Sequence, residues 1–481
     1  MDTNTLNKAL KFYINGEWVE PSSDVTIEVR NPATEEPITR LAMGNGADAE
    51  RAIAAARAAF PSFAQTSREE RLALLRRVLA SYQVRLQSIA DAMTLEMGAP
   101  APFALNLQAG IGTAHITQMI QTLESFEFES QRGSTRVVKE PIGVVALITP
   151  WNWPINQIAC KVLPALAAGC TMVLKPSELA PLNAIIFAEA LHEAGVPKGV
   201  FNLVNGDGPS VGQVLASHWD VDMVSFTGST RAGVIVAKVA ADTVKRVHQE
   251  LGGKSANILL PDCDFPRAVA EGVRACFSNS GQSCNAPTRM LVPRERHAEV
   301  VEIARQTALS VTVGDPQDDH IQLGPVISAN QYEKIQSLIA RGIAEDAELV
   351  CGGLGRPAGL SRGHFVQPTI FANVTPEMTV AREEIFGPVL AIMPYDSEEQ
   401  AVAIANDSVY GLAGYVQSTD LARARKIAHQ LRVGNVYLNY PAWDPAAPFG
   451  GYKQSGNGRE YADFALHDFL EIKGIVGYSQ P

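Results

Sequence analysis

The chain has little of what marks secreted, membrane-bound or metal-binding proteins. Its six cysteines, at positions 160, 170, 263, 276, 284 and 351, show no CxxC spacing, and its nine histidines form no HxxxH or HxH pair. These absences argue against a disulfide framework and a zinc motif and favour reduced thiols. No apolar run reaches the ~18 residues that span a bilayer. Residues 1–20 lack a basic region followed by an apolar stretch, so no secretory signal is expected. We therefore predict a cytoplasmic protein without a metal site.

The chain also lacks a surplus of positive charge. It has 40 Lys and Arg against 51 Asp and Glu, a net charge of −11. No basic face is therefore expected for nucleic acid or an anionic membrane. Hydrophobic residues make up 46% and charged residues 19%, which is a globular composition. Because 481 residues exceed one ordinary core, two or three domains are expected.

Short apolar segments alternate with helical ones in the first half of the chain. Candidate strands cover 144–148, 171–174, 201–204 and 223–226, and each is followed by a candidate helix. This βαβ pattern predicts a parallel, doubly wound sheet, which binds ligands beyond the carboxyl ends of its strands. The loops at those ends are 150–154, 175–178, 205–208 and 227–233. A second α/β block follows residues 252–253, with helices over 331–342 and 398–406 and a strand over 388–394.

The segments outside these blocks combine helices with a few strands. Asn15-Gly16 predicts the turn of a hairpin. Asp48 is the expected cap of an Ala-rich helix, and the capping box that starts at Ser67 predicts a long helix that Gly98 stops. We expect helices over 48–60, 67–97 and 111–128, and strands over 12–19, 133–140 and 470–478.

One cysteine has an unusual neighbourhood. Cys284 ends the segment Phe277-Ser278-Asn279-Ser280-Gly281-Gln282-Ser283-Cys284, in which small polar residues favour turns and Gly281 permits a positive φ. A cysteine that only packs usually lies among Leu, Ile and Val. Backbone amides and polar groups instead lower the pKa of a thiol and make it nucleophilic. Cys284 is therefore a candidate nucleophile, and the alternative is an inert, half-buried cysteine.

Two of the loops have features of a nucleotide site. Thr227–Gly233 follows a strand and begins a helix, so its glycines and helix N-terminus suit a pyrophosphate, although a plain β–α turn fits equally well. Lys175 and Glu178 could bind ribose hydroxyls, and the acidic side chain would disfavour a 2′-phosphate. The alternative for this second pair is a solvated ion pair.

Three further positions are candidates for catalysis or contact. Asn152, between two tryptophans, could donate a hydrogen bond to an oxyanion, or it could cap a helix. Glu250 could act as a general base if an apolar crevice raises its pKa, and it could equally be an ordinary exposed glutamate. Glu384 and Phe386 precede a strand, and the phenylalanine is also consistent with core packing.

These segments together resemble the aldehyde dehydrogenase superfamily, of the non-phosphorylating, NAD(P)-dependent kind. The resemblance rests on the order of Pro150–Pro154, Glu250–Lys254, Gly281–Cys284 and Glu384–Pro388, and it runs almost from end to end. It implies an α/β fold with a Rossmann-like NAD-binding domain, an α/β catalytic domain and a small β oligomerisation element. The expected ranges are 1–121 and 142–251 for the first, 252–452 for the second, and 122–141 with 453–481 for the third. It also implies a homodimer or homotetramer.

The resemblance implies a role for each matched residue. Cys284 matches the nucleophile, Glu250 the base that activates water, and Asn152 with the backbone N–H of Cys284 the oxyanion hole. The cofactor would be NAD, with NADP as the alternative. Its expected contacts are Thr149, Pro150, Trp151, Lys175, Ser177, Glu178, Gly208, Phe226, Gly228, Ser229, Leu251, Gly252, Glu384 and Phe386. The expected aldehyde tunnel is lined by Trp153, Cys160, Ser283, Trp443 and Phe449.

The implied reaction oxidises an aldehyde to the carboxylic acid through a cysteine thiohemiacetal and a thioester. No Arg or Lys is among the tunnel residues, so neutral aromatic or medium-chain aldehydes are expected rather than short dicarboxylic semialdehydes. Ser283 and Asn285 replace cysteines that some relatives carry beside the nucleophile, which weakens any substrate analogy. The alternatives are a semialdehyde dehydrogenase, a coenzyme A-acylating enzyme, which generally lacks a glutamate at position 250, and a non-catalytic binding or structural protein.

Overall fold

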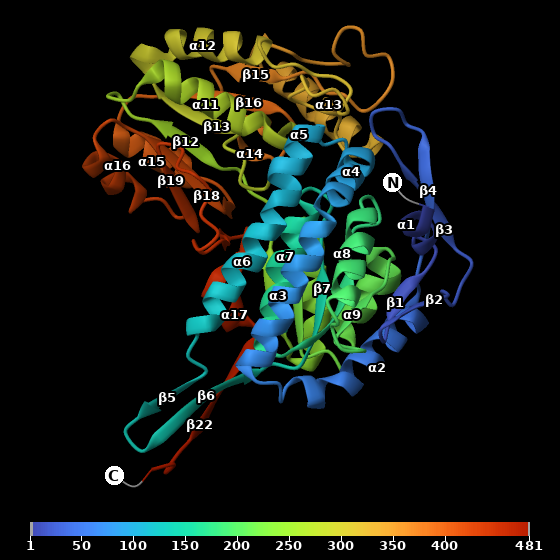
Figure 1. Cartoon of the computed structure of the whole chain (residues 1–481). Helices are drawn as coiled ribbons and strands as arrows, with labels where there is room; N and C mark the ends of the chain where they lie inside the picture. The colour runs from blue at the N-terminus through green and yellow to red at the C-terminus, as the bar shows by residue number, and fades with distance from the viewer. Residues whose placement is uncertain (1–2, 480–481) are drawn as a thin grey trace.

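Two large β-sheets with helices on their faces form the body of the molecule (Figure 1). The computed structural model describes residues 3–479; residues 1–2 and 480–481, at the outer ends of the predicted first and third domain ranges, lie outside this description. The first sheet has eight strands in the order β2-β1-β9-β8-β7-β10-β11-β21, and the second has seven, in the order β14-β15-β16-β13-β12-β18-β19. The predicted α/β architecture is confirmed.

The centre of the first sheet is the parallel part that the apolar segments predict. Its strands pair in parallel, and all but the start of β11 are buried along their length because helices cover both faces. These strands are β7 (Val144–Ile148), β8 (Thr171–Lys175), β9 (Phe201–Leu203), β10 (Met223–Thr227) and β11 (Arg246–Glu250). The hairpin β1 (Phe12–Ile14) and β2 (Glu17–Val19) extends one edge, and β21 (Gly456–Asn457) extends the other.

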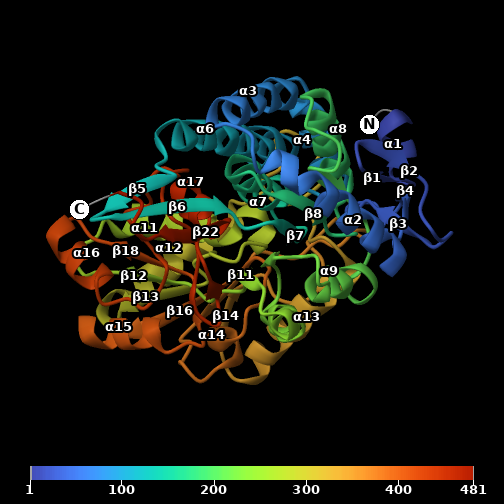
Figure 2. The ribbon, with the colours of Figure 1, turned by 90° about the horizontal axis from the view of Figure 1, so that it is seen from below.

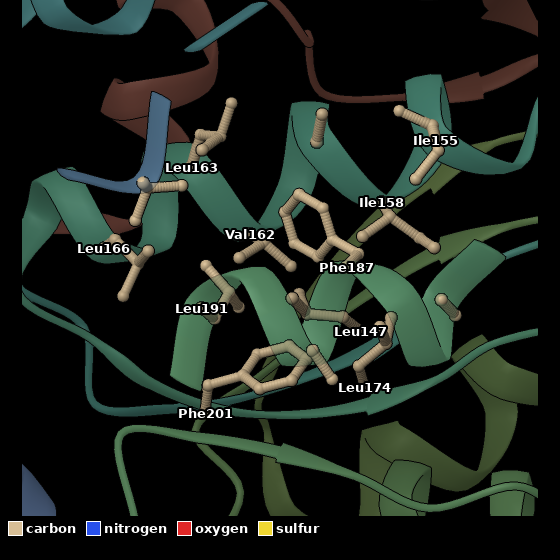
Figure 3. Close-up of a cluster of buried hydrophobic side chains, with 14 of the residues drawn as sticks. Leu147, Ile155, Ile158, Val162, Leu163, Leu166, Leu174, Phe187, Leu191 and Phe201 are labelled. Atoms are coloured by element: carbon tan, nitrogen blue, oxygen red, sulfur yellow. The ribbon is translucent and has the colours of Figure 1, made fainter. Parts of the chain in front are cut away.

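Helices on the two faces of this sheet build two separate cores. The connecting helices are α7 (Pro154–Ala168), α8 (Leu182–Glu193), α9 (Gln213–Ser217) and α10 (Thr230–Ala240). Figure 3 shows Ile158 and Val162 of α7 beside Phe187 of α8, above Leu147 and Leu174 of the sheet. Each such fully buried side chain contributes about 1.5–3 kcal/mol. The opposite face packs on α2 and α9 (Figure 2).

The N-terminal helices differ from the prediction at two points. Helix α2 (Gly46–Phe63) begins earlier than expected, because Asn45 is its cap and Asp48 completes the capping box. The predicted long helix is two helices, α3 (Arg68–Val84) and α4 (Leu86–Met97), which the backbone of Arg85 separates with φ −101° and ψ 3°. The Arg85 guanidinium donates to the Ser81 carbonyl and pairs with Glu193 of α8. This tertiary contact lies outside any periodicity of the sequence.

The second sheet and its helices form the other half of the body. Its strands are β12 (Ala256–Leu259), β13 (Arg289–Pro293), β14 (Glu348–Cys351), β15 (Thr369–Ala372), β16 (Val389–Tyr395), β18 (Ala413–Gln417) and β19 (Asn435–Leu438). Its helices are α11 (Phe265–Phe277), α12 (His297–Leu309), α13 (Ala329–Ala344), α14 (Thr379–Arg382), α15 (Glu398–Asn406) and α16 (Leu421–Ala428). The predicted helices and strand of this half are confirmed to within about two residues.

A three-stranded antiparallel sheet projects from the body as an arm (Figure 1). Strands β5 (Glu129–Arg132) and β6 (Thr135–Pro141) follow α6 (Gly110–Ser125), and β22 (Leu470–Ile475) pairs with β6. Helix α17 (Ala462–Asp468), which precedes β22, packs on α6 and α7. The remaining short elements are α1 (Thr3–Lys8), β3 (Thr26–Arg30), β4 (Pro37–Ala42), α5 (Ala101–Phe103), β17 (Tyr410–Gly411) and β20 (Tyr452–Lys453).

None of the helices within residues 3–479 is both long enough and apolar enough to cross a membrane.

Candidate active site

A pocket lies where the carboxyl ends of β7, β10 and β11 face the second half of the molecule. It brings together predicted residues from five separate segments: Pro150, Trp151, Asn152, Gly228, Ser229, Leu251, Gly252, Cys284, Glu384 and Phe386. Gln157, Thr227, Gln331 and Lys334 complete its lining and were missed by the sequence analysis. The position agrees with the rule that doubly wound sheets bind ligands beyond the carboxyl ends of their strands.

The loop that presents Cys284 is held in an unusual backbone conformation. After α11 ends at Phe277, Asn279, Ser280 and Gly281 all have positive φ, at 55°, 55° and 73°. A Cβ on Gly281 would lie 2.1 Å from the backbone of Gly387, so only glycine fits there. Gln282 fixes the loop further by accepting a hydrogen bond from the Ile327 N–H at 2.9 Å. The half-buried thiol therefore comes from a rigid loop that faces the pocket.

The predicted lowering of the Cys284 pKa is wrong for this structure. Burial, followed by the charges of Glu250, Glu384 and Glu460, raises the pKa of the Cys284 thiol. The backbone hydrogen bond works in the predicted direction but is outweighed. A thiol in this setting needs a proton acceptor nearby before it can attack.

Asn152 is tied to the cysteine loop and does not cap a helix. The N-cap of α7 is Trp153, so the capping alternative for Asn152 is excluded. The Asn152 side-chain amide donates to the Gln282 carbonyl at 3.0 Å. Its backbone carbonyl accepts from the side chains of Asn279, at 2.8 Å, and Gln108, at 3.2 Å. The amide is therefore oriented next to the residues that precede Cys284.

Gln108 is a site residue that the sequence analysis missed. It is fully buried in a π-helical turn, Ala104–Ala109, that precedes α6, and its amide also donates to Asn279 Oδ1 at 3.1 Å. Such π-helical turns are frequent at functional sites. Nothing in the spacing of this Ala- and Leu-rich segment predicts the wider turn that aims Gln108 at the loop.

Glu250 lies at the end of β11 as a buried carboxylate without hydrogen bonds. Glu250 is 2% exposed, and neither of its carboxylate oxygens has a hydrogen-bond partner among the described residues. Burial, with the charge of Glu460 in the same direction, raises its pKa to about 7. The alternative of an ordinary exposed glutamate is excluded. A carboxylate that titrates near neutrality can take a proton from water.

A buried ion pair next to Glu250 was also missed. Lys161, on α7, is fully buried and pairs with Glu460, which is 2% exposed. The Cys160 thiol donates to the other oxygen of Glu460 at 3.1 Å. Lys161 is the only charged residue in the apolar sequence of α7, and that was the available signal, since buried lysines are nearly always paired.

Glu384 and Phe386 close the side of the pocket that the second half supplies. Glu384 Oε1 accepts from the Gly253 N–H at 2.8 Å, and a Cβ on Gly252 would lie 2.6 Å from the carboxylate. Phe386 has a φ of 60°, and its ring meets Trp151 edge to face, with 5.5 Å between centroids. Phe386 lines the pocket, so packing in the core does not account for it.

The β10–α10 turn has the geometry of an anion site. The hydroxyl of Ser229 caps α10 by accepting from the Ala232 N–H at 3.3 Å. A Cβ on Gly228 would lie 2.6 Å from the ring of the predicted contact Phe226. Thr227 Oγ1 is buried without a hydrogen-bond partner among residues 3–479. Free backbone amides at a helix N-terminus suit a phosphate group.

The remaining predicted cofactor residues are not part of the pocket lining and lie around the end of β8. Lys175 is buried and donates to the carbonyls of Pro176, at 2.9 Å, and Gly206, at 2.7 Å, so it is not part of a solvated ion pair. Its contact with Glu178 is long, at 3.5 Å. Nearby, the Thr149 N–H donates to the Lys175 carbonyl, and the Ser177 hydroxyl accepts from the Leu179 N–H. Gly208 begins a π-helical turn.

The predicted tunnel residues fall into two contacting groups. Trp153 donates its indole N–H to the Ser283 hydroxyl at 2.8 Å, which links α7 to the residue before Cys284. Cys160 and Phe449 belong to a small apolar cluster with Leu412 and Tyr461, against which Cys284 packs.

Trp443 lies at the outside of this region. It is 40% exposed, and its ring contacts His115 and Tyr461 at centroid distances of 5.3 and 6.1 Å. His115 and Tyr461 were missed by the sequence analysis. Burial lowers the pKa of His115 to about 4, so its imidazole is neutral and, like the rings around it, adds no charge.

The described residues hold no group of three or more His, Cys, Asp or Glu side chains arranged to bind a metal ion.

Comparison with known proteins agrees with this arrangement. The family model "Aldehyde dehydrogenase family" matches residues 18–475. A Pseudomonas protein named 3-succinoylsemialdehyde-pyridine dehydrogenase is 56% identical over 469 residues, covering 97% of this chain and 98% of the relative.

Solved structures match over nearly the whole chain. Aldehyde dehydrogenase C (AldC) from Pseudomonas syringae, crystallised as a cysteine-to-alanine mutant with NAD⁺ and octanal, superposes with a TM-score of 0.98 at 54% identity, covering 100% of this chain and 98% of AldC. An aldehyde dehydrogenase from Mycobacterium tuberculosis, complexed with NAD⁺, has a TM-score of 0.95 at 42% identity, covering 97% of this chain and 98% of that one. The chain therefore belongs to the aldehyde dehydrogenase family, and it is an oxidoreductase of that family.

Proposed function

We propose that this chain oxidises an aldehyde to its carboxylic acid with NAD⁺ through a thioester on Cys284. One observation carries the proposal: a pocket-facing cysteine shares its surroundings with an oriented amide, Asn152, and a buried carboxylate without hydrogen bonds, Glu250. These are the three groups that acyl chemistry on a thiol requires: a nucleophile, a donor for the oxyanion and a base for water.

The residues around the pocket fit NAD⁺. Gly228 and the N-terminus of α10 leave room and free amides for a pyrophosphate, and the unpartnered Thr227 hydroxyl lines the same wall. Lys175, Ser177 and Glu178 are placed for the adenosine ribose, and Glu384 with Phe386 for the nicotinamide side. Bound NAD⁺ supplies the acceptor for the hydride that leaves the substrate carbon. NAD⁺ is proposed over NADP⁺, because the Glu178 carboxylate would repel a 2′-phosphate.

The chain's own groups account for bond making and bond breaking at the carbonyl. The Cys284 thiol loses its proton to a water molecule in the pocket, and its sulfur then attacks the aldehyde carbon. The amide of Asn152 and the backbone N–H of Cys284 stabilise the oxyanion. After oxidation, Glu250 takes a proton from water, the resulting hydroxide attacks the thioester, and the acid leaves as the Cys284 sulfur is released.

The proposed substrate is a neutral, medium-sized aldehyde, aromatic or aliphatic. Apolar and aromatic side chains surround the approach to Cys284, and the buried cation there, Lys161, is already paired with Glu460. The other cation, Lys334, lines the pocket together with Glu384 and Phe386, on the side proposed for the nicotinamide. A dicarboxylic semialdehyde would need a free cation for its carboxylate. AldC from Pseudomonas syringae was crystallised with octanal, and the name of the Pseudomonas relative denotes a pyridine-bearing semialdehyde. Both observations support this class of substrate.

A coenzyme A-acylating reaction is the second candidate, and Glu250 argues against it. A carboxylate with a pKa of about 7 beside the thiol favours attack by water on the thioester. Transfer to a second thiol does not require that base.

The proposed organisation follows the predicted ranges. Residues 1–121 and 142–251 would bind NAD⁺, and residues 252–452 would carry the nucleophile. Residues 122–141 with 453–481 would mediate a homodimer or homotetramer. The arm supports the last assignment, because Ile472 and Val476 are 73% and 82% exposed on it. We also propose a cytoplasmic location, since all six cysteines are free.

The test is the appearance of NADH absorbance with octanal, benzaldehyde and succinic semialdehyde as substrates. We expect turnover with the first two, a higher kcat/KM than for succinic semialdehyde, and no turnover in Cys284→Ala. Cys276→Ala is the matched control, because Cys276 is buried on α11 away from the pocket lining and its loss should leave turnover intact. Turnover of more than a few per cent in Cys284→Ala contradicts the assignment of the nucleophile.

A further inference from the structure

A histidine lies behind the proposed base on the same strand. His248 and Glu250 are two residues apart on β11, and alternate residues of a strand point to the same face. Both are buried, at 4% and 2% exposure. The proposed mechanism assigns no role to His248.

The two nitrogens of His248 face two different carboxylates. Nδ1 is hydrogen-bonded to Asp468 Oδ2, at the end of α17. Nε2 lies 3.6 Å from Glu250 Oε1 and has no hydrogen-bond partner among the described residues. The imidazole therefore lies between the Asp468 carboxylate, whose side chain is 28% exposed, and the buried Glu250 carboxylate.

The surrounding backbone is shaped to admit this arrangement. Gly458 has a φ of 82°, and a Cβ there would lie 2.4 Å from His248 Nδ1 and 2.8 Å from Asp468 Oδ2. The Arg459 N–H donates to the same Asp468 oxygen at 3.2 Å, which holds the carboxylate toward the ring. Only a glycine at position 458 leaves room for the histidine and the aspartate to meet.

The charges around the ring favour an imidazolium. Burial acts against the charged form, but the hydrogen bond to Asp468, the contact with Glu250 and the charge of Glu460 outweigh burial and the opposing charge of Lys161. Together they raise the pKa of His248 to about 9. In return, the imidazolium acts to lower the pKa of Glu250 against the effect of burial.

We propose that Asp468 and His248 form a positioning pair for the general base: Asp468 holds an imidazolium 3.6 Å from Glu250 and thereby keeps a larger fraction of that carboxylate ionised and able to deprotonate water. This inference rests on the proposed function, because it assigns the pair to hydrolysis of the Cys284 thioester. It differs from a purely structural role in one respect: it ties the pH dependence of hydrolysis to the charge on residue 248.

The test uses 4-nitrophenyl acetate, an activated ester that acylates a thiol directly and needs no cofactor. The burst of 4-nitrophenol measures acylation of Cys284, and the steady rate that follows measures hydrolysis of the acyl-enzyme. Both phases are recorded from pH 5.5 to 9.5 for the unsubstituted protein, His248→Gln and Asp468→Asn. His467→Gln is the matched control, since His467 neighbours Asp468 on α17 but faces Phe126.

We expect His248→Gln to keep the burst of 4-nitrophenol. The acid limb of the steady rate, the pH range over which the rate falls as Glu250 is protonated, should move to higher pH by about one unit or more. This shift is the effect of removing a neighbouring opposite charge. With the limb starting at about pH 7, a shift of one unit makes the steady rate at pH 7 about fivefold lower, and the rate recovers toward pH 9. Asp468→Asn should move the limb in the same direction, by less, because an imidazole without its counterion ionises less readily. His467→Gln should leave both phases unchanged.

Three outcomes overturn the proposal. An acid limb that stays in place in both variants while the burst is intact removes the pair from hydrolysis. A burst and a steady rate that fall in proportion at every pH identify a structural role only. A missing burst in the unsubstituted protein, together with no oxidation of any aldehyde, shows that the proposed function itself has failed, and the assignment of the pair fails with it.

Discussion

Two buried glutamates in this molecule have a pKa raised to about 7 by burial, yet their surroundings are opposite. Glu96, on α4, accepts hydrogen bonds from the backbone N–H groups of Leu182 and Asn183, at 2.7 and 3.0 Å, and from the Asn183 amide at 2.6 Å. Glu250 has no hydrogen bond on either oxygen. The Glu96 carboxylate caps the start of α8, because Pro181, the N-cap residue of that helix, makes no side-chain hydrogen bond. Glu250 directly precedes Leu251 and Gly252, which line the pocket.

The comparison shows that burial alone does not mark a catalytic acid or base. Desolvation moves both pKa values in the same direction. What separates them is whether the lone pairs are satisfied by the fold, because a satisfied carboxylate stabilises structure and an unsatisfied one retains acceptor capacity for a ligand or for water. Substitutions of three glutamates sharpen this contrast, and the largest effect is expected at Glu250.

Glu250→Gln should stop steady turnover while leaving the fold intact. Loss of a general base typically lowers the rate by 10²–10⁴-fold. The free energy of unfolding should change by no more than about 1 kcal/mol, since no hydrogen bond is lost. Rapid-mixing absorbance should show about one NADH per active site followed by little turnover. Loss of the burst itself would assign Glu250 to activation of the thiol, and an unchanged steady rate would remove it from the mechanism.

Glu96→Gln should lower the free energy of unfolding and leave turnover nearly unchanged. The amide places an N–H group against donors that now point at a carboxylate, which costs about 1–3 kcal/mol at a buried site. Denaturant unfolding at pH 5 should show this loss, and kcat per folded protein should stay within about twofold of the unsubstituted enzyme. A loss of activity without a loss of stability would place Glu96 in the catalytic machinery and break the comparison.

The stability cost of Glu96→Gln should shrink as pH rises. Because the pKa of Glu96 is raised in the folded protein, its protonated form contributes stability below pH 4.5 that is lost as pH rises through about 7. Glutamine does not titrate, so the variant lacks this loss. The free energy of unfolding should therefore change less between pH 5 and pH 8 in the variant than in the unsubstituted protein. A stability cost of Glu96→Gln that grows with pH contradicts the assignment.

The smallest effect is expected at Glu178, a carboxylate whose side chain is one-third exposed. Glu178→Gln should raise kcat/KM for NADP⁺ relative to NAD⁺ by less than about tenfold, because a partly solvated charge contributes about 1 kcal/mol or less. Glu193→Gln, at an exposed site on α8, is the control. An enzyme that prefers NADP⁺ before any substitution overturns the role given to Glu178.

Features of the fold and the site were predicted correctly where neighbouring residues in the sequence cause them, and were missed where remote contacts do. The βαβ strands were predicted to within about a residue, because each is a short apolar run bounded by turn residues. The break at Arg85 was missed, and the side chain at this position pairs with Glu193, more than 100 positions away, which no local signal indicates. The pKa of Cys284 was predicted in the wrong direction, because it is raised first by burial and then by carboxylates from three other segments, and neither is visible in the local sequence.

The sequence by itself determined the order of the strands and helices, the family resemblance and the chemical types at the site: one thiol, one amide and one carboxylate. The tertiary structure decided which polar groups are satisfied. Gln108 reaches the cysteine loop through a π-helical turn, Lys161 is neutralised by Glu460, and His248 meets Asp468 only because Gly458 leaves room. Hydrogen bonding and desolvation depend on distances between segments remote in sequence, and those distances exist only in the folded chain.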